Sequence, residues 1–203
     1  MPLLAFLVLL AGSCLASFAV IYYTLVTNQS TNRPDYFRLR SEFFETEFPM
    51  SWFAVTWVNK NETTGSIGEA VIASTNLFAA LALRVYDEGA ARSYLAENRL
   101  TDPFSVVVFE ANRLYNWSLQ DNSNATLTFV ENGTTSVSGY EAVFSRVLIK
   151  GGIKQEEAFY NLTSMFIVFR AQQRLAEIVS WGKEEDWRLA QETFKAILGL
   201  TKV

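Results

Sequence analysis

The stretch that decides the fold runs from Tyr140 to Trp181 and reads YEAVFSRVLIKGGIKQEEAFYNLTSMFIVFRAQQRLAEIVSW. Aromatic and β-branched residues dominate it, and short polar groups divide it, which is typical of β-strands joined by turns. We expect strands at residues 140–149, 157–169 and 174–181. Lys150-Gly151-Gly152 supplies a hairpin turn between the first two of these strands. The centre of the domain is therefore predicted to be a β-sheet.

The residues after this stretch predict a helix that lies on the sheet. Three acidic residues at 184–186 stand where a helix start favours negative charge, and Gly199 is a plausible stop at its end. One face of the helix is apolar, because large or small apolar side chains recur at helical spacing. These positions are Trp187, Ala190, Phe194, Ile197 and Leu198.

The residues before Tyr140 predict further strands and two helices. Asp87-Glu88-Gly89 is expected to close a strand as a turn, and Asp102-Pro103 ends the first helix. Residues 104–119 fit both a strand and a helix, and we favour the helix because its apolar residues also recur at helical spacing. The expected strands lie at 52–58, 66–74, 77–86 and 126–130, and the expected helices at 90–100 and 104–119.

An uncharged apolar run opens the sequence. No side chain from Pro2 to Thr27 is charged, and the first charged residue is Arg33. As a helix the run is about 39 Å long, which exceeds the roughly 30 Å thickness of the hydrocarbon core of a bilayer. We therefore predict an N-terminal transmembrane anchor that contacts the bilayer through residues 2–27. The expected organisation is an anchor at 1–27, a juxtamembrane linker at 28–41 and one domain at 42–203.

Two other fates remain open for this apolar run. A cleaved signal peptide needs a basic segment before a shorter apolar core; the basic segment is missing, which favours an uncleaved signal-anchor. Cys14, the only cysteine, is a candidate for lipidation. The residues before Cys14 fit a lipobox poorly, so a small apolar residue within the helix is the simpler interpretation.

Two features of the sequence predict opposite sides of the membrane for the domain. Arg33, Arg38 and Arg40 follow the apolar run, and the positive-inside rule places such residues in the cytoplasm. The chain nevertheless holds six N-x-S/T sequons, whereas its Asn, Ser and Thr content predicts about two by chance. We give the sequons more weight and expect a single-pass glycoprotein of the cell membrane with an extracytoplasmic domain. The glycosylation candidates are Asn28, Asn61, Asn116, Asn124, Asn132 and Asn161.

The composition argues against most catalytic chemistry. The chain has no histidine and a formal net charge of −4, which removes the commonest general base and metal ligand. Because Cys14 lies in the apolar run, the domain has neither a disulfide nor a thiolate nucleophile. The sequence lacks the clustered basic residues that would indicate a nucleic-acid partner. Glu42, Glu45 and Glu47 are best interpreted as a solvated strand edge. We therefore predict no catalytic residue, no metal site and no cofactor.

Three short stretches resemble the PsbP-like family, which is named for an extrinsic subunit of the photosynthetic oxygen-evolving complex. Residues 48–52 (FPMSW) are similar to the family's F-x-x-P-x-x-W start, with a shorter Phe–Pro spacing. Residues 137–142 (VSGYEA) resemble its x-x-G-x-x-A entry into a long strand. The closing helix resembles its F-x-x-I-L-x-S-F ending, with Gly199-Leu200 in place of the final pair. The likeness covers residues 43–203.

This resemblance implies an α+β fold, an α/β sandwich with a central antiparallel sheet flanked by helices. It also implies a binding or assembly role without catalysis. We therefore expect a non-enzymatic accessory protein that binds another membrane or envelope protein. The alternative is a glycosylated, pilin-like filament subunit whose apolar helix packs in a filament core. A further hypothesis is that tryptophans line a groove for a peptide or a sugar. Trp117, which lies inside one sequon, is the tryptophan expected to be exposed.

Overall fold

The computed structural model describes residues 35–58 and 65–203. Strands form where β-branched and aromatic residues gather, and helices form where a capping residue precedes apolar residues at helical spacing. In chain order, the elements of the described residues are β1 (Tyr36–Arg40), β2 (Glu45–Pro49), β3 (Trp52–Val58), β4 (Gly68–Ser74), β5 (Ala79–Tyr86), α2 (Glu88–Glu97), α3 (Pro103–Asp121), β6 (Thr126–Val137), β7 (Tyr140–Gln155), β8 (Ala158–Ala171), β9 (Arg174–Lys183) and α4 (Glu184–Leu200).

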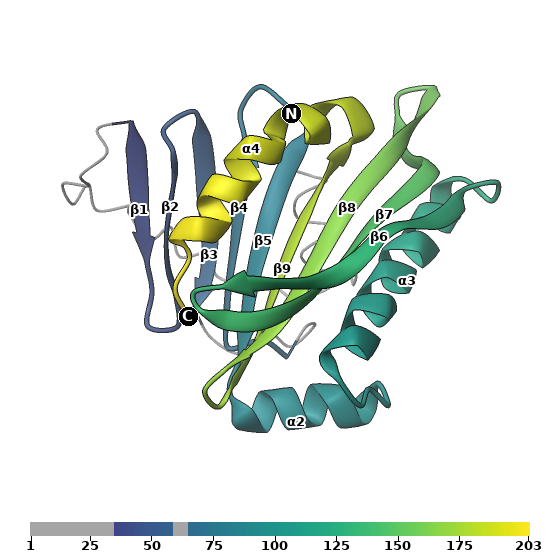
Figure 1. Cartoon of the computed structure of the whole chain (residues 1–203). Coiled ribbons are helices and arrows are strands. Elements are labelled where there is room, and N and C mark those ends of the chain that lie inside the picture. The colour runs from purple at the N-terminus through teal and green to yellow at the C-terminus, as the bar shows by residue number, and fades with distance from the viewer. Residues whose placement is uncertain (1–34, 59–64) are drawn as a thin grey trace.

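Seven of these strands form one antiparallel sheet in the order β3-β4-β5-β9-β8-β7-β6 (Figure 1). The three strands expected in the stretch from Tyr140 to Trp181 are its neighbouring strands β7, β8 and β9. The pairing of β5 with β9 joins the early strands of the chain to the late ones. β1 and β2 form a separate two-stranded sheet.

Both faces of the large sheet are covered, because alternate side chains along each strand point to opposite faces. Helices α2 and α3 cover one face, over a core that includes Val71 and Val168. Helix α4 and the β1–β2 pair contribute to the core of the other face, which includes Ile72 and Ile167. Figure 1 shows α4 crossing the front of the sheet and α2 lying along its lower end. The prediction of an antiparallel sheet flanked by helices is confirmed.

The two internal helices begin at capped residues. The Asp87 side chain accepts a hydrogen bond from the Ala90 backbone N–H at 2.7 Å and starts α2. The expected turn at Asp87-Glu88-Gly89 is therefore wrong, because these residues start a helix. Asp102 and Ser105 form a capping box at the start of α3. Each side chain accepts a hydrogen bond from the other residue's backbone N–H, which would otherwise lack a partner. Helix α3 confirms the helix favoured for residues 104–119.

The expected hairpin turn at Lys150-Gly151-Gly152 is also wrong. Strand β7 continues through these residues to Gln155, and its pairing with β8 shifts register between Ile149 and Ile153. Gly151 takes a positive φ of 63° within this irregularity, which glycine adopts without steric cost. The chain reverses after Gln155 instead, where Glu156 has a φ of 55°.

Two boundaries also differ from their predicted positions. Gly199 does not end α4, which continues to Leu200 and is followed by Thr201, whose hydroxyl donates to the Ile197 carbonyl oxygen at 2.8 Å. Residues 36–40, predicted as part of the linker, form β1. The polar appearance of β1 conceals an apolar contact, since the ring centroids of Phe37 and Phe48 lie 5.9 Å apart. The folded domain therefore begins before residue 42.

The predicted anchor at residues 1–27 and the linker up to residue 34 lie outside the described residues. Of the helices in the described part of the chain, none has the length and apolar character needed to cross a membrane. The anchor therefore stays a prediction from the sequence.

Candidate functional site

The sequon asparagines lie in different structural settings. Asn28 and Asn61 are outside the described residues. Asn116 is exposed on α3, Asn124 is exposed in the loop after α3, and Asn132 is exposed on the edge strand β6. These three positions are open to solvent, although occupancy by a glycan stays a prediction.

The side-chain amide of Asn161 is engaged at both its nitrogen and its oxygen, whereas that of Asn132 accepts from the Ser145 hydroxyl through its oxygen. Asn161 is half-buried on β8. Its side-chain nitrogen donates to Glu184 Oε2 at 2.8 Å, and its Oδ1 accepts from the Gly151 backbone N–H at 3.3 Å. These contacts join the base of the β7–β8 hairpin to the first turn of α4, so Asn161 has a structural role.

Two of the three acidic residues singled out in the sequence, Glu45 and Glu47, belong to ion pairs at the small β1–β2 sheet. Glu47 on β2 pairs with Arg38 on β1 at 2.9 Å, and Glu45 pairs with Arg40 at 3.7 Å. Trp117 is half-buried and packs against the core beside α3, so the expectation that it is exposed is wrong. Among the described residues, no group of three or more Asp, Glu, Cys or His side chains is placed to hold a metal ion.

A buried network of charged and phenolic side chains, which sequence reasoning missed, lies between the sheet and the α2–α3 layer. Glu69, Arg84 and Glu177 are direct neighbours across β4, β5 and β9. Glu110 reaches them from α3. All four side chains are at most 6% exposed. The network, as the term is used below, comprises Glu69, Arg84, Tyr86, Tyr94, Glu110, Arg113 and Glu177.

Arg84 is the centre of this network. Its Nε donates to Glu69 Oε1 at 3.2 Å, and its Nη1 donates to Glu110 Oε2 at 3.4 Å. The same Nη1 lies 3.6 Å from Glu177 Oε2. Burial alone would lower the pKa of Arg84, but the carboxylates of Glu69 and Glu110 more than offset this effect and raise that pKa. Arg84 is therefore a permanent buried cation.

Two tyrosines complete the network from two different elements. Tyr86 on β5 donates its hydroxyl to Glu177 Oε2 at 3.2 Å, and Tyr94 on α2 donates its hydroxyl to Glu110 Oε1 at 2.8 Å. Their rings stack with centroids 5.0 Å apart. Burial is the main cause that raises the pKa of both phenols, which stay neutral donors.

The surroundings of Glu177 raise its pKa. Burial and then the nearby charge of Glu110 raise its pKa to about 7, although Arg84 acts in the opposite direction. Its Oε1 is buried and has no hydrogen-bond partner. The network therefore contains one carboxyl group that changes charge near neutral pH.

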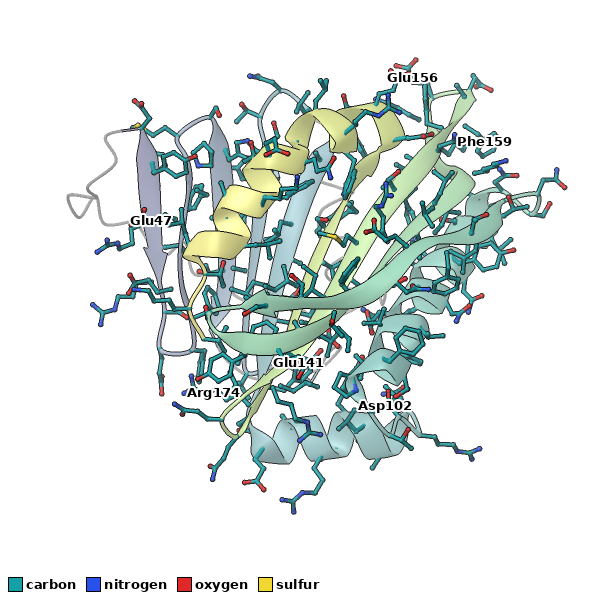
Figure 2. The ribbon with its side chains drawn as sticks, viewed as in Figure 1. Glu47, Asp102, Glu141, Glu156, Phe159 and Arg174 are labelled. Atoms are coloured by element: carbon teal, nitrogen blue, oxygen red, sulfur yellow. The ribbon has the colours of Figure 1, made fainter. Side chains whose placement is uncertain are left out.

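A second feature is an aromatic pair at the surface. Within the described residues, the exposed large apolar side chains are Met50, Phe104, Phe129, Val130, Phe159, Tyr160 and Leu189. Phe159 and Tyr160 are consecutive and are 46% and 41% exposed. Figure 2 shows Phe159 near the end of the β7–β8 hairpin. Lys183 Nζ lies 3.9 Å from the Tyr160 ring centroid. We call Phe159, Tyr160 and Lys183 the hairpin surface.

The architecture has a counterpart among solved structures. Cyanobacterial PsbP (CyanoP) from Synechocystis sp. PCC 6803 superposes with a TM-score of 0.52, over 95% of this chain and 98% of that chain. The fold is PsbP-like. The two sequences are 10% identical, so the likeness shows the fold alone. The resemblance predicted from three short stretches of sequence is confirmed at this level.

Two further solved structures are similar to the PsbP-like domain at lower scores. The Ran-binding protein Mog1p of Saccharomyces cerevisiae has a TM-score of 0.42 and 8% identity, over 79% of this chain and 89% of that chain. LpqN of Mycobacterium tuberculosis, which is involved in cell envelope biogenesis, has a TM-score of 0.39 and 10% identity, over 78% and 82% of the two chains. No protein-family model and no curated protein matches the sequence.

Proposed function

We propose that this chain is a non-enzymatic accessory protein that binds another membrane or envelope protein through its PsbP-like domain. Residues 2–27 tether it to the cell membrane with the domain on the extracytoplasmic side. The observation that carries the binding role is the exposure of two large aromatic side chains, Phe159 and Tyr160, which lie on opposite faces of the β7–β8 hairpin near its turn. Aromatic side chains that become buried on binding are frequent energetic anchors of protein interfaces.

The hairpin surface also has a polar surround that suits an interface. Lys183 covers the Tyr160 ring at 3.9 Å, and Lys154 and Glu156 are exposed beside the hairpin turn. Each of the two aromatic side chains therefore offers an apolar contact with polar groups beside it, and protein interfaces combine an apolar centre with a polar rim. The partner is therefore expected to offer an apolar pocket with polar groups of both charges around it.

The position of the hairpin surface fits a tethered protein. The start of β1 and the β7–β8 turn lie at the same end of the sheet (Figure 1). Asp35, where the described chain begins, accepts a hydrogen bond from the Met50 backbone N–H at 3.0 Å. The residues between 28 and 34 span at most about 24 Å when fully extended. A tether at residues 2–27 would keep this end of the domain close to the membrane, where the exposed part of a membrane protein lies.

Site-specific photo-crosslinking tests the proposal in the full-length, membrane-inserted protein. A photoreactive residue at position 159 should give one dominant adduct with one partner protein. The same residue in place of Leu189, which is 70% exposed on α4, is the matched control and should give no such adduct. The proposed function is wrong if neither position forms an adduct while the chain is folded and inserted, or if the adduct is only with other copies of this chain. The latter result supports the filament alternative.

A further inference from the structure

The network holds more negative than positive charge when every acid is ionised. Three carboxyl groups, Glu69, Glu110 and Glu177, meet two guanidinium groups, Arg84 and Arg113. Four of these five side chains are nearly inaccessible to water, and Arg113 is 40% exposed. An unbalanced charge in such a setting is costly because water cannot solvate it. The charges balance when one carboxyl group holds a proton.

The hydrogen bonds indicate which carboxyl group holds that proton. Glu110 accepts from Tyr94 at 2.8 Å, from Arg113 at 2.6 Å and from Arg84 at 3.4 Å. Glu69 accepts from Arg84 Nε at 3.2 Å. Glu177 accepts from the neutral hydroxyl of Tyr86 at 3.2 Å and lies 3.6 Å from Arg84 Nη1, and its Oε1 is buried without a hydrogen-bond partner. Donors stabilise the ionised form of a carboxyl group, so Glu177, with its unpartnered Oε1, is the least stabilised anion of the three.

We propose that Glu177 is a proton-binding site that couples the packing of α2 and α3 on the sheet to pH. The protonated form gives a neutral network that joins the two layers. Loss of the proton leaves one excess negative charge between them. This inference concerns the inside of the domain and is independent of the proposed partner.

The groups that face Glu177 come from every element packed around it. Glu69 lies on β4, and Arg84 and Tyr86 lie on β5. From the helical layer, Tyr94 lies on α2, and Glu110 and Arg113 lie on α3. The neighbouring strand β8 contributes Val168, an apolar residue, at the register position opposite Glu177. The sheet residues are fixed by ladders of backbone hydrogen bonds, whereas the two helices are held to this region by side chains.

The repulsion caused by the excess charge should therefore loosen the packing of the helices and leave the sheet in place. Glu110 is repelled by an ionised Glu177, and its partner Arg113 is already partly in water. Movement of α3 by a small amount would let water reach both carboxylates. Tyr94 would lose its acceptor as Glu110 moves, which would release α2 as well.

The direction of the pH effect follows from the raised pKa of Glu177. The folded value is about 7 and the ordinary value is 4.5, so the folded state binds the proton more tightly than the unfolded state. The stabilisation is fully present below pH 4.5 and is lost as the pH rises through about 7. One proton changes the folding equilibrium constant by at most about tenfold per pH unit in this window.

Hydrogen exchange of the full chain in lipid nanodiscs tests the proposal between pH 5.5 and 8.5, after correction for the intrinsic pH dependence of exchange. In the native chain, protection of residues 88–97 and 103–113 should fall by on the order of tenfold or more as the pH rises. Protection of β8 and β9 should change less. In Glu177→Gln, which mimics the protonated acid, protection of the helices should not depend on pH. Glu97→Gln, an exposed position on α2, is the control and should behave as the native chain does.

Infrared spectroscopy gives a second measurement that does not need a folded variant. The carbonyl stretch of a buried protonated carboxylic acid should be present in the native chain at pH 5.5 and should disappear by pH 8.5. Absence of this band at pH 5.5 overturns the proposal. So does helix protection that is independent of pH in the native chain, or that keeps the same dependence in Glu177→Gln.

Discussion

At the scale of single residues, the central position of Arg84 leads to a prediction for its removal. Arg84→Met keeps most of the side-chain volume but leaves three buried carboxyl groups without their shared cation. Removing one partner of a buried ion pair typically costs about 3–5 kcal/mol, so the free energy of unfolding should fall by about that amount at pH 7. Urea unfolding followed by circular dichroism measures it.

The control for this prediction is an exposed arginine with a similar local partner. Arg92 is 77% exposed and pairs with Glu88 at 2.8 Å on α2. Because exposed pairs contribute at most about 1 kcal/mol, Arg92→Met should change the stability little. Equal effects of the two substitutions would show that the network does not stabilise the fold through Arg84.

Sequence reasoning could have suspected the network residues but could not have joined them. Glu69, Arg84 and Glu177 each stand within a run of apolar residues, which signals a buried charge. Whether three such charges meet depends on the register of β4, β5 and β9, and that register is set by contacts between distant segments. The sequon asparagines are the opposite case, because their motif is local and can be read directly.

At the scale of elements, the start of α2 gives a second prediction. Asp87 accepts from the Ala90 backbone N–H at 2.7 Å, and loss of such a cap costs about 1 kcal/mol. Asp87→Ala should therefore lower the free energy of unfolding by about 1 kcal/mol. Amide protection should fall more in α2 than in the rest of the domain. Asp87→Asn retains an acceptor oxygen and should lose much less. The cap has no role in holding α2 if the two variants are equally stable.

The elements were easier to predict from the sequence than their ends. Strand and helix patterns depend on local periodicity, so most strands and all three described helices could be assigned. The turn predicted at Gly151 and the helix end predicted at Gly199 were wrong. Glycine occurs in turns, in bulges and inside helices, and its tertiary setting decides which of these it forms. β1 was missed because its apolar contact with β2 involves alternate residues within a short polar segment.

At the scale of the whole molecule, one sheet carries two cores. Neighbouring residues such as Val71 and Ile72 on β4 point to opposite faces and belong to different cores. The PsbP-like arrangement could be anticipated from sequence patterns, but the sharing of a single sheet by both cores depends on the β5–β9 pairing. Damage to either core should therefore destabilise the same seven strands.

Matched substitutions on the two faces test whether the domain unfolds as one unit. Phe194 on α4 is 1% exposed and its ring lies 5.6 Å from that of Trp52, while Leu114 on α3 is 7% exposed in the other core. Phe194→Ala should cost about 3–5 kcal/mol and Leu114→Ala about 2–5 kcal/mol. Both should move one single transition, seen at the same urea concentration by tryptophan fluorescence and by circular dichroism. If one substitution shifts only the fluorescence transition, the two cores unfold separately and the sheet does not couple them. Coincident shifts would show that the two cores unfold together. In that case, ionisation of Glu177, which loosens the α2–α3 layer, also lowers the free energy of unfolding of the whole domain.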